Sequence, residues 1–396
     1  MKLILFSDTH LGFGLGTERE QDPFLTFEEG IEKATHADAL ILAGDLFDTR
    51  TPTPETFSRS MESLLKLSQE NPPVEVSGIS KEIKPLAGIP VIALHGNHER
   101  RVRGLVNPVE ALEKGGFMFH LHCNGILLKT GGEQVAIQGM SAVPDKYASQ
   151  ALKEWAPSPV PGAYNILLIH QTIEGFIRAP GGLPKQSLPE GFDLYICGDI
   201  HESRQSEAHG SPLLFPGSSI ATQITKDSQK PRLYWEINTT TSQLNSIPFK
   251  RQRTIHYKEF KSEEEARTFL KSLPREGELK PIVKLQSPLH QEEVQSLAGS
   301  QALLHLSKET PQAPTRQEQA LSVQESGRKL LENNLKQFSL DPKTFETIFE
   351  LLLEKKREEA LKLLRKQAKN IHGKENSGES GPPSPPAAQP RGSQPD

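Results

Sequence analysis

The sequence predicts a layered α/β fold, and three observations carry this prediction. Short apolar runs typical of strands alternate with helical segments up to about residue 240. Several of these runs are apolar throughout, as strands buried on both faces must be. Two of them, LILAGDLFD and YICGDIHES, end in the same Gly-Asp pair. Because a bare carboxylate at the tip of a buried strand is costly without a positive partner, Asp45 and Asp199 predict a charged site at the strand ends.

The first predicted domain spans residues 1–250. Helices are expected at 53–69 and at 107–116, and the second ends in the glycines typical of a position just past a helix. The prolines of residues 156–162 exclude both helix and strand, so that stretch is expected to be a loop. The predicted strands are residues 2–6, 37–43, 89–95, 125–129, 134–138, 163–170, 192–197, 213–215 and 232–237.

A second, small α/β domain is predicted at residues 251–308, where the order changes to strand, helix, strand, helix, strand. Ser262 and Glu265 have the spacing of a capping box, which predicts the start of the first helix. The expected elements are residues 254–260, 262–273, 281–287, 290–299 and 301–307.

The remainder of the chain is predicted to contain three further parts. Residues 309–318 are expected to be a linker, and residues 319–372 to be helical, with an apolar stripe that suits packing on this chain or on a partner. Residues 373–396 consist mainly of Pro, Gly, Ser and charged residues, so they are expected to be disordered.

Composition and charge exclude several classes of protein. With 46 basic and 50 acidic residues the net charge is -4, so a nucleic-acid partner would need local positive charge or bound metal. The only cysteines, Cys123 and Cys197, exclude a disulfide framework, and Cys197 is expected in the core. No apolar stretch is long enough to span a membrane, and the first residues do not form a signal peptide. We therefore expect a cytoplasmic protein, with association at the nucleoid.

Polar side chains follow five predicted strands at the point where each strand ends. In an open α/β sheet such groups gather beyond the carboxyl ends of the strands, so we expect them to converge. Carboxylates, imidazoles and an amide oxygen are suitable ligands for two divalent cations, and a carboxylate can bridge cations about 3.5 to 4 Å apart. These residues are Asp8 and His10, Asp45 and Asp48, Asn97 and His98, His170, and Asp199 and His201.

Each of these residues also has an ordinary structural explanation. Asp8 could cap the following loop, Asp45 could begin a helix, and Asp48 could orient a ligand or cap a turn. Five such coincidences at five strand ends are a poor joint explanation, so we favour the cation site.

The sequence resembles the calcineurin-like metallophosphoesterase superfamily in the order of its motifs. These motifs are D-x-H, G-D-x-x-D, G-N-H-E, a single His, and a final Gly followed by His. Four stretches resemble the SbcD-type nuclease of DNA double-strand-break repair. They are GDLFDTRTPTPETF, IPVIALHGNHERRVRG, GFDLYICGDIHES and GSPLLFPGSSIAT. The resemblance is strong over about residues 1–250 and weak from there to about 370. It implies a β-sandwich flanked by helices, a small capping domain and C-terminal helices.

The resemblance also implies roles for single residues. His98 is implied as the catalytic histidine, and the cations are expected to be Mn²⁺, with Mg²⁺ as an alternative. One cation would be held by Asp8, His10, Asp45 and His201, and the other by Asp45, Asn97, His170 and Asp199.

Asp199 departs from the family, which usually has His at this position. A carboxylate still suits Mn²⁺ or Mg²⁺, but it makes the ligand cage more anionic and should weaken its attraction for a phosphodiester. The other interpretation is that Asp199 only orients His170 or His201.

The expected partners follow partly from charge and partly from the resemblance. Arg100, Arg101 and Arg103 lie directly behind His98 and are expected to contact DNA phosphates, although such a charge run is often only a solvated surface. The resemblance places Ser218 and Ser219 near the substrate. It also implies DNA ends and hairpins as substrates, a homodimer through the helices at 53–69 and 107–116, and an SbcC-type SMC-like ATPase bound by residues 319–372.

Two alternative functions remain compatible with the sequence. One is a phosphoesterase of the same fold that acts on nucleotides or phosphomonoesters, and the other is a noncatalytic scaffold. The basic residues behind His98, the small domain and the C-terminal helices favour the nuclease over the first. The nearly complete ligand set and the presence of His98 favour it over the second.

Overall fold

The computed structural model describes residues 1–70, 74–80, 82–102, 104–176, 182–273 and 279–306, together with the single residues 347 and 363. The chain divides into two compact units, Met1–Glu309 and Thr310–Asp396. Apart from those two single residues, the predicted helical segment at 319–372 lies outside the described residues. The disordered tail expected at 373–396 and the linker expected at 309–318 lie outside them too.

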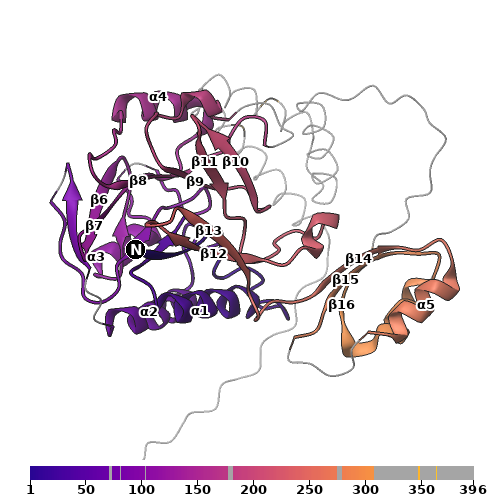
Figure 1. Cartoon of the computed structure of the whole chain (residues 1–396). Coiled ribbons are helices and arrows are strands. Elements are labelled where there is room, and N and C mark those ends of the chain that lie inside the picture. The colour runs from indigo at the N-terminus through magenta and orange to yellow at the C-terminus, as the bar shows by residue number, and fades with distance from the viewer. Residues whose placement is uncertain are drawn as a thin grey trace, which may run out of the picture. The chain divides into compact units, whose positions relative to one another are not determined.

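Two stacked β-sheets form the body of the first unit (Figure 1). In order across the first sheet, the strands are β13 (Gln243–Pro248), β12 (Leu233–Asn238), β1 (Lys2–Phe6), β2 (Ala39–Leu42), β4 (Val91–Ala93) and β5 (Phe119–His120). Across the second sheet they are β10 (Arg204–Ala208), β11 (Ser211–Phe215), β9 (Leu194–Gly198), β8 (Tyr164–His170), β7 (Glu133–Met140), β6 (Asn124–Thr130) and β3 (Glu75–Ile79). The predicted fold class is confirmed.

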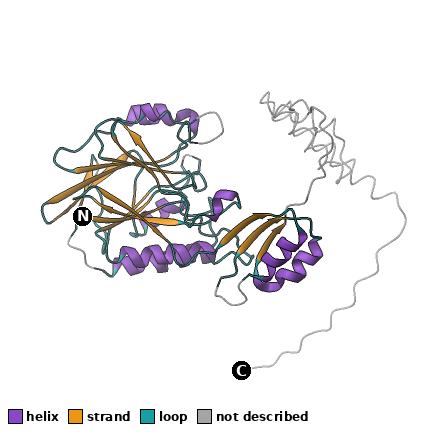
Figure 2. Cartoon of the chain, turned by 45° about the vertical axis from the view of Figure 1, so that its right-hand side comes forward, coloured by secondary structure: helices purple, strands orange, loops and turns teal. Residues whose placement is uncertain are grey.

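The alternation of side chains along each strand builds the layers. On β1, Leu3 and Leu5 point into the core between the sheets, whereas Ile4 and Phe6 pack outward. Burying one such side chain stabilises the fold by roughly 1.5–3 kcal/mol. Helices cover both outer faces (Figure 2): α1 (Asp22–Ala34), α2 (Pro54–Ser68) and α3 (Pro108–Lys114) on the first sheet, and α4 (Asp145–Trp155) on the second.

Parallel pairing brings the strand ends together. The strands β1, β2 and β4 are parallel neighbours, and so are β8 and β9 in the other sheet. The register aligns Phe6 with Leu42, Leu42 with Ala93, and His170 with Gly198. Within each sheet, the polar residues that follow these strand ends therefore lie side by side.

The small domain has a parallel sheet of three strands, β14 (Ile255–Glu259), β15 (Ile282–Gln286) and β16 (Leu303–Leu306). The helices α5 (Glu263–Lys271) and α6 (Gln291–Ala298) share an apolar core with this sheet. Helix α5 begins where Ser262 predicts, but the capping box is wrong because the Ser262 side chain makes no cap hydrogen bond. Three glutamates in the first turn complement the helix dipole instead.

Several elements were not predicted from the sequence. The edge strands β10 and β13 are mostly exposed, so they lack the apolar runs that indicate a strand. Helix α1 was also missed, although Phe24, Phe27 and Ile31 form a buried stripe at helical spacing. Among the described helices, none is long and apolar enough to cross a membrane.

Candidate metal centre

The predicted site residues gather where strands of the two sheets end. The first sheet contributes the loops after β1, β2 and β4, and the second contributes the end of β8 and the loop after β9. Three overlapping groups of side chains place their ligand atoms within 4.8 Å of one another: Asp8, His10 and His201; His10, Asp45 and His98; and Asp8, Asp45 and His170. Each pair of these groups shares one side chain, namely His10, Asp8 or Asp45.

The first half of the site is built around His10. Its Nε2 lies 3.2 Å from Nε2 of His201, and Asp8 Oδ1 lies 3.7 Å from the same His201 atom. On the other side of the His201 ring, Nδ1 is 3.2 Å from the Thr222 hydroxyl. Burial lowers the pKa of His201, which favours the neutral form that a metal ligand requires.

The second half of the site is built around His170. Its Nδ1 donates to the carbonyl oxygen of Ala43 at 2.7 Å, which turns Nε2 toward the carboxylates. Asp45 Oδ2 lies 3.5 Å and Asp199 Oδ1 lies 3.9 Å from that Nε2 atom. Asn97 joins the group because its amide nitrogen donates to Asp199 Oδ1 over 2.7 Å.

Two buried atoms of the site indicate that the residues fit cations. Among the described residues, Asp8 Oδ1 and His170 Nε2 are buried polar atoms that make no hydrogen bond. Leaving such an atom unsatisfied costs about 1–3 kcal/mol, and cations bound at these two side chains would satisfy them. Carboxylate, imidazole and amide donors are also the set that Mn²⁺ and Mg²⁺ accept.

Without a cation, a proton on His170 offsets the carboxylates. Burial by itself lowers the pKa of His170, but the nearby charges of Asp45, Asp8 and Asp199 outweigh it and raise the pKa to about 10. Burial raises the pKa of Asp8 to about 6, opposed by the charge of His170. A cation must therefore displace a proton from His170.

Left-handed backbone turns aim the ligands into the site. Asp8, His10, Asp45 and Asp199 have φ angles of 51°, 49°, 46° and 83°, a region that non-glycine residues rarely adopt. Backbone bonds hold these turns, including Asp8 N to Gly44 O and His10 N to Asp45 O, both at 3.0 Å. Such strain at a cluster of polar side chains is a mark of a functional site.

The Gly-Asp pairs are needed for space as well as for conformation. A Cβ atom added at Gly44 would lie 2.1 Å from His170 Nδ1, and one at Gly198 would lie 2.5 Å from the same atom. Both glycines therefore let the His170 ring pass between the two loops. The Gly-Asp pair occurs twice in the sequence because both glycines lie against the His170 ring.

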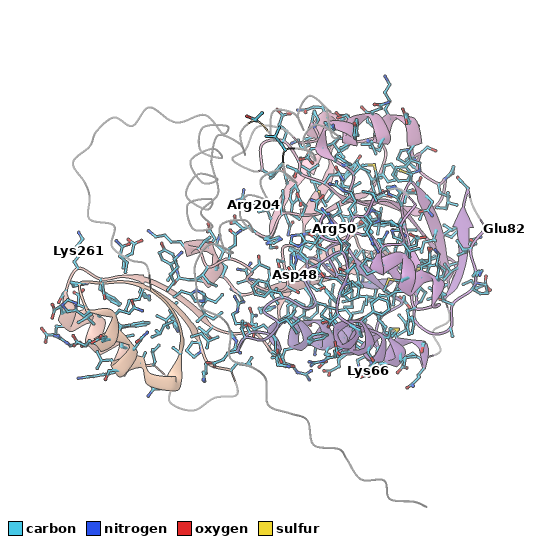
Figure 3. The ribbon with its side chains drawn as sticks, turned by 180° about the vertical axis from the view of Figure 1, so that it is seen from behind. Asp48, Arg50, Lys66, Glu82, Arg204 and Lys261 are labelled. Atoms are coloured by element: carbon cyan, nitrogen blue, oxygen red, sulfur yellow. The ribbon has the colours of Figure 1, made fainter. Side chains whose placement is uncertain are left out.

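His98 differs from the other candidate site residues with which it is grouped in being exposed. Its side chain is 45% exposed, its backbone N–H donates to Asp45 Oδ1 at 2.9 Å, and its Nδ1 lies 2.8 Å from the carbonyl oxygen of Asp48. The Asp48 carboxylate lies 3.6 Å from His98 Nδ1 and 3.3 Å from His10 Nδ1. Asp48, which Figure 3 labels in the two-sheet body, thus faces one ring nitrogen of each of these two histidines, and its orienting role stays a prediction. Hydrogen bonding to Asp48 is the main cause that raises the pKa of His98 to about 9.

Glu99 was not singled out from the sequence. It is fully buried, and its two carboxyl oxygens accept the backbone N–H groups of Phe47 and Gly96, both at 2.8 Å. These bonds tie the loop that carries Asp45 to the loop that carries Asn97. Its place in the G-N-H-E motif was the only sequence signal, and that signal did not reveal its partners.

The residues expected to contact DNA differ in their exposure. Arg100 and Arg101 are partly exposed beside His98, whereas Arg103 lies outside the described residues. Ser218 and Ser219 are 1% and 0% exposed, and the Ser218 hydroxyl donates to backbone carbonyls, including that of Asp8. The two side chains therefore pack their loop against the site, and contact of this loop with DNA stays a prediction.

Two arginines at the entry to the small domain, Arg251 and Arg253, form ion pairs. Arg253 Nε donates to Asp22 at 2.6 Å, and Arg251 pairs with Glu32 at 2.8 Å. These arginines therefore stabilise contacts between the small domain's entry segment and α1.

A two-sheet sandwich with carboxylates and imidazoles converging at its strand ends defines a metallophosphoesterase. Residues 1–203 match the family described as calcineurin-like phosphoesterase, and the chain belongs to this family. This confirms the resemblance found in the sequence motifs.

Similar proteins carry names from DNA repair. The DNA double-strand break repair protein Mre11 of Methanopyrus kandleri is 29% identical over 236 residues, which are 55% of this chain and 48% of that protein. The double-strand break repair protein mre-11 of Caenorhabditis elegans is 27% identical over 273 residues, 57% of this chain and 38% of that protein. The chain thus spans about half or less of the length of these relatives.

The solved structures give a more distant likeness. A putative 5'-nucleotidase from Staphylococcus aureus aligns with a TM-score of 0.36 at 14% identity, over 62% of this chain and 52% of that one. A likeness at this level bears on neither substrate nor mechanism.

Cation binding is expected to release protons. At pH 7 the metal-free protein holds a proton on His170, and binding through the neutral imidazole frees about one proton per chain. Because that proton competes with the cation below pH 10, the affinity for Mn²⁺ should rise with pH across the neutral range. Titration calorimetry in buffers of different ionisation enthalpy measures the release, and identical heats in all buffers would contradict it.

Replacing Asp48 should make His98 more acidic. Because Asp48 stabilises the imidazolium, the Asp48→Asn change should move the pKa of His98 from about 9 down toward the ordinary 6.5. An NMR titration of the His98 ring protons in the metal-free protein gives the value directly. The exposed Asp227, changed to Asn, is the matched control. An unchanged His98 titration in Asp48→Asn would show that another group holds the proton.

Proposed function

We propose that this chain is a metal-dependent DNA nuclease of a double-strand-break repair complex, which hydrolyses phosphodiester bonds with two divalent cations. The observation that carries the proposal is the overlap of the ligand groups on Asp8, His10 and Asp45, with shared carboxylates between adjacent cation positions. Mn²⁺ is the expected cation and Mg²⁺ the alternative. The names of the similar proteins support DNA as the substrate.

The proposed ligand sets follow the two halves of the site. Asp45 is common to both, because its oxygens contact groups from both sides. One cation is assigned to Asp8, His10, Asp45 and His201, and the other to Asp45, Asn97, His170 and Asp199.

Each group has a defined task in the proposed reaction. When bound, the cations polarise the phosphoryl oxygens and make water a better nucleophile at neutral pH. His98 is protonated at neutral pH, so its exposed ring can donate a proton or hydrogen bond to the leaving oxygen. Asp48 stabilises the protonated form of that ring. The buried strand ends keep the ligands in place.

Arg100 and Arg101 are proposed to contact the DNA backbone next to the scissile phosphate. Each contact to a phosphate releases counterions, so binding should weaken at all sequences when one is lost. In Arg100→Gln the slope of log affinity against log salt should fall by about one. Lys153→Gln on the exposed face of α4 serves as control, and an equal loss in both variants would remove the arginine from the interface.

The proposed partners use other parts of the chain. A homodimer is proposed through α2 and α3, where Leu65 of α2 is exposed at 44%. An SbcC-type ATPase is proposed to bind residues 319–372, nearly all of which lie outside the described residues. A chain ending before residue 319 should keep nuclease activity and lose binding of the ATPase.

The His98→Ala variant tests the proposal most simply. Manganese-loaded wild type should cleave end-labelled duplex and hairpin DNA, and His98→Ala should lose about 10²- to 10⁴-fold in rate because a general acid is missing. The variant should still bind two Mn²⁺ ions per chain, measured by metal analysis after gel filtration. Exposed His36, at the other end of β2, gives the matched control His36→Ala.

The same assay separates the alternative functions. Each protein is given a phosphomonoester as well as DNA, with and without the ATPase partner. Cleavage of the monoester alone would favour a nucleotide or phosphomonoester phosphatase. A wild type that binds Mn²⁺ but cleaves nothing under any condition would favour the scaffold.

A further inference from the structure

Asp199 uses its two carboxyl oxygens in different ways. Oδ1 faces His170 Nε2 at 3.9 Å and accepts from the Asn97 amide at 2.7 Å. Oδ2 accepts the hydroxyl of Thr172 at 2.8 Å. Thr172 is buried, and the Asp199 side chain is 19% exposed. One oxygen therefore faces the proposed cation site, and the other is held by the Thr172 hydroxyl.

The register of the second sheet brings Thr172 and Asp199 together. His170 at the end of β8 is aligned with Gly198 at the end of β9. Thr172 lies two residues past His170, and Asp199 directly follows Gly198 with a left-handed φ of 83°. The strained turn at Asp199 and the threonine on the neighbouring strand end thus set the direction of one carboxylate.

We propose that Thr172 is a positioning residue that limits Asp199 to one metal-facing oxygen; this inference rests on the proposed function. A carboxylate can bind a cation through one oxygen or through both. Binding through both would compete with the Thr172 bond, because the hydroxyl already occupies one lone pair of Oδ2. With Thr172 in place, Asp199 would offer the cation one oxygen and leave a second coordination position free.

The open position matters for the reaction. A catalytic cation needs a place for water or for a phosphoryl oxygen, and a second carboxylate oxygen would fill that place. An imidazole can offer only one donor atom here, whereas an aspartate offers two. The Thr172 hydroxyl therefore lets an aspartate act as a ligand with a single donor.

A purely structural role for Thr172 is the competing explanation, since a buried hydroxyl also stabilises a partly buried carboxylate. The two explanations differ in a property that stability does not affect, namely the number of water molecules on the bound cations. Relaxation of water protons by protein-bound Mn²⁺ measures that number. This readout does not depend on turnover.

The experiment compares Thr172→Val with wild type at equal manganese loading. Thr172→Val keeps the shape and loses the hydroxyl, so Asp199 should bind through both oxygens and displace water. The relaxation enhancement should fall, and turnover should fall about 10- to 100-fold, while two Mn²⁺ ions per chain are still bound. Thr172→Ser should restore both values. Thr26→Val removes another buried hydroxyl, on α1, and should change neither.

A double substitution tests the pairing itself. In an Asp199→His background, Thr172→Val should leave the relaxation enhancement unchanged. The imidazole has no second donor atom that could bind the cation when the hydroxyl is lost. If Thr172→Val folds poorly, Thr172→Ala removes the same hydroxyl and is compared in the same two backgrounds. An unchanged enhancement in the single variant, with both Mn²⁺ ions bound, would overturn the role of Thr172. Absence of Mn²⁺ binding in wild type would instead overturn the proposed function.

Discussion

The site depends on the buried carboxylate of Asp45. This side chain is 2% exposed, and its oxygens meet the His98 backbone on one side and the His170 ring on the other. A buried charge of this kind is tolerated only if positive groups surround it. In the metal-free protein the charged His170 has that role, and in the proposed holoenzyme two cations take it over. The same carboxylate thus couples the two sheets electrostatically.

The surrounding backbone is shaped to this arrangement. A Cβ at Gly96 would lie 2.0 Å from Asp45 Oδ1, so only glycine fits at this position of the neighbouring loop. The left-handed turns at four ligands cost roughly 1–3 kcal/mol each, and they persist because the strands before them are fixed in the core. A close-packed pair of sheets therefore serves as the rigid support for a strained edge. Rigid support of this kind keeps ligand atoms a few ångströms apart before any cation binds.

Much of this architecture could be predicted from the sequence, because its signals are local. Buried runs such as residues 2–6 and 163–170 mark strands, and their polar ends mark the edge where ligands meet. Contacts made across the fold could not be predicted in the same way. Glu99 reaches Phe47, and Thr172 reaches Asp199, only because loop paths and strand register bring them together. The burial of Ser218 and Ser219 could not be predicted for the same reason, since nothing in their local sequence indicates it.

The central claim is that two cations share Asp45. The most direct measurement is an anomalous difference map from a crystal of the wild-type chain grown with manganese, collected at the manganese edge. The account predicts two peaks in each chain, about 3.5 to 4 Å apart, with the Asp45 carboxylate between them. A single peak, or two peaks that do not both contact Asp45, would contradict it.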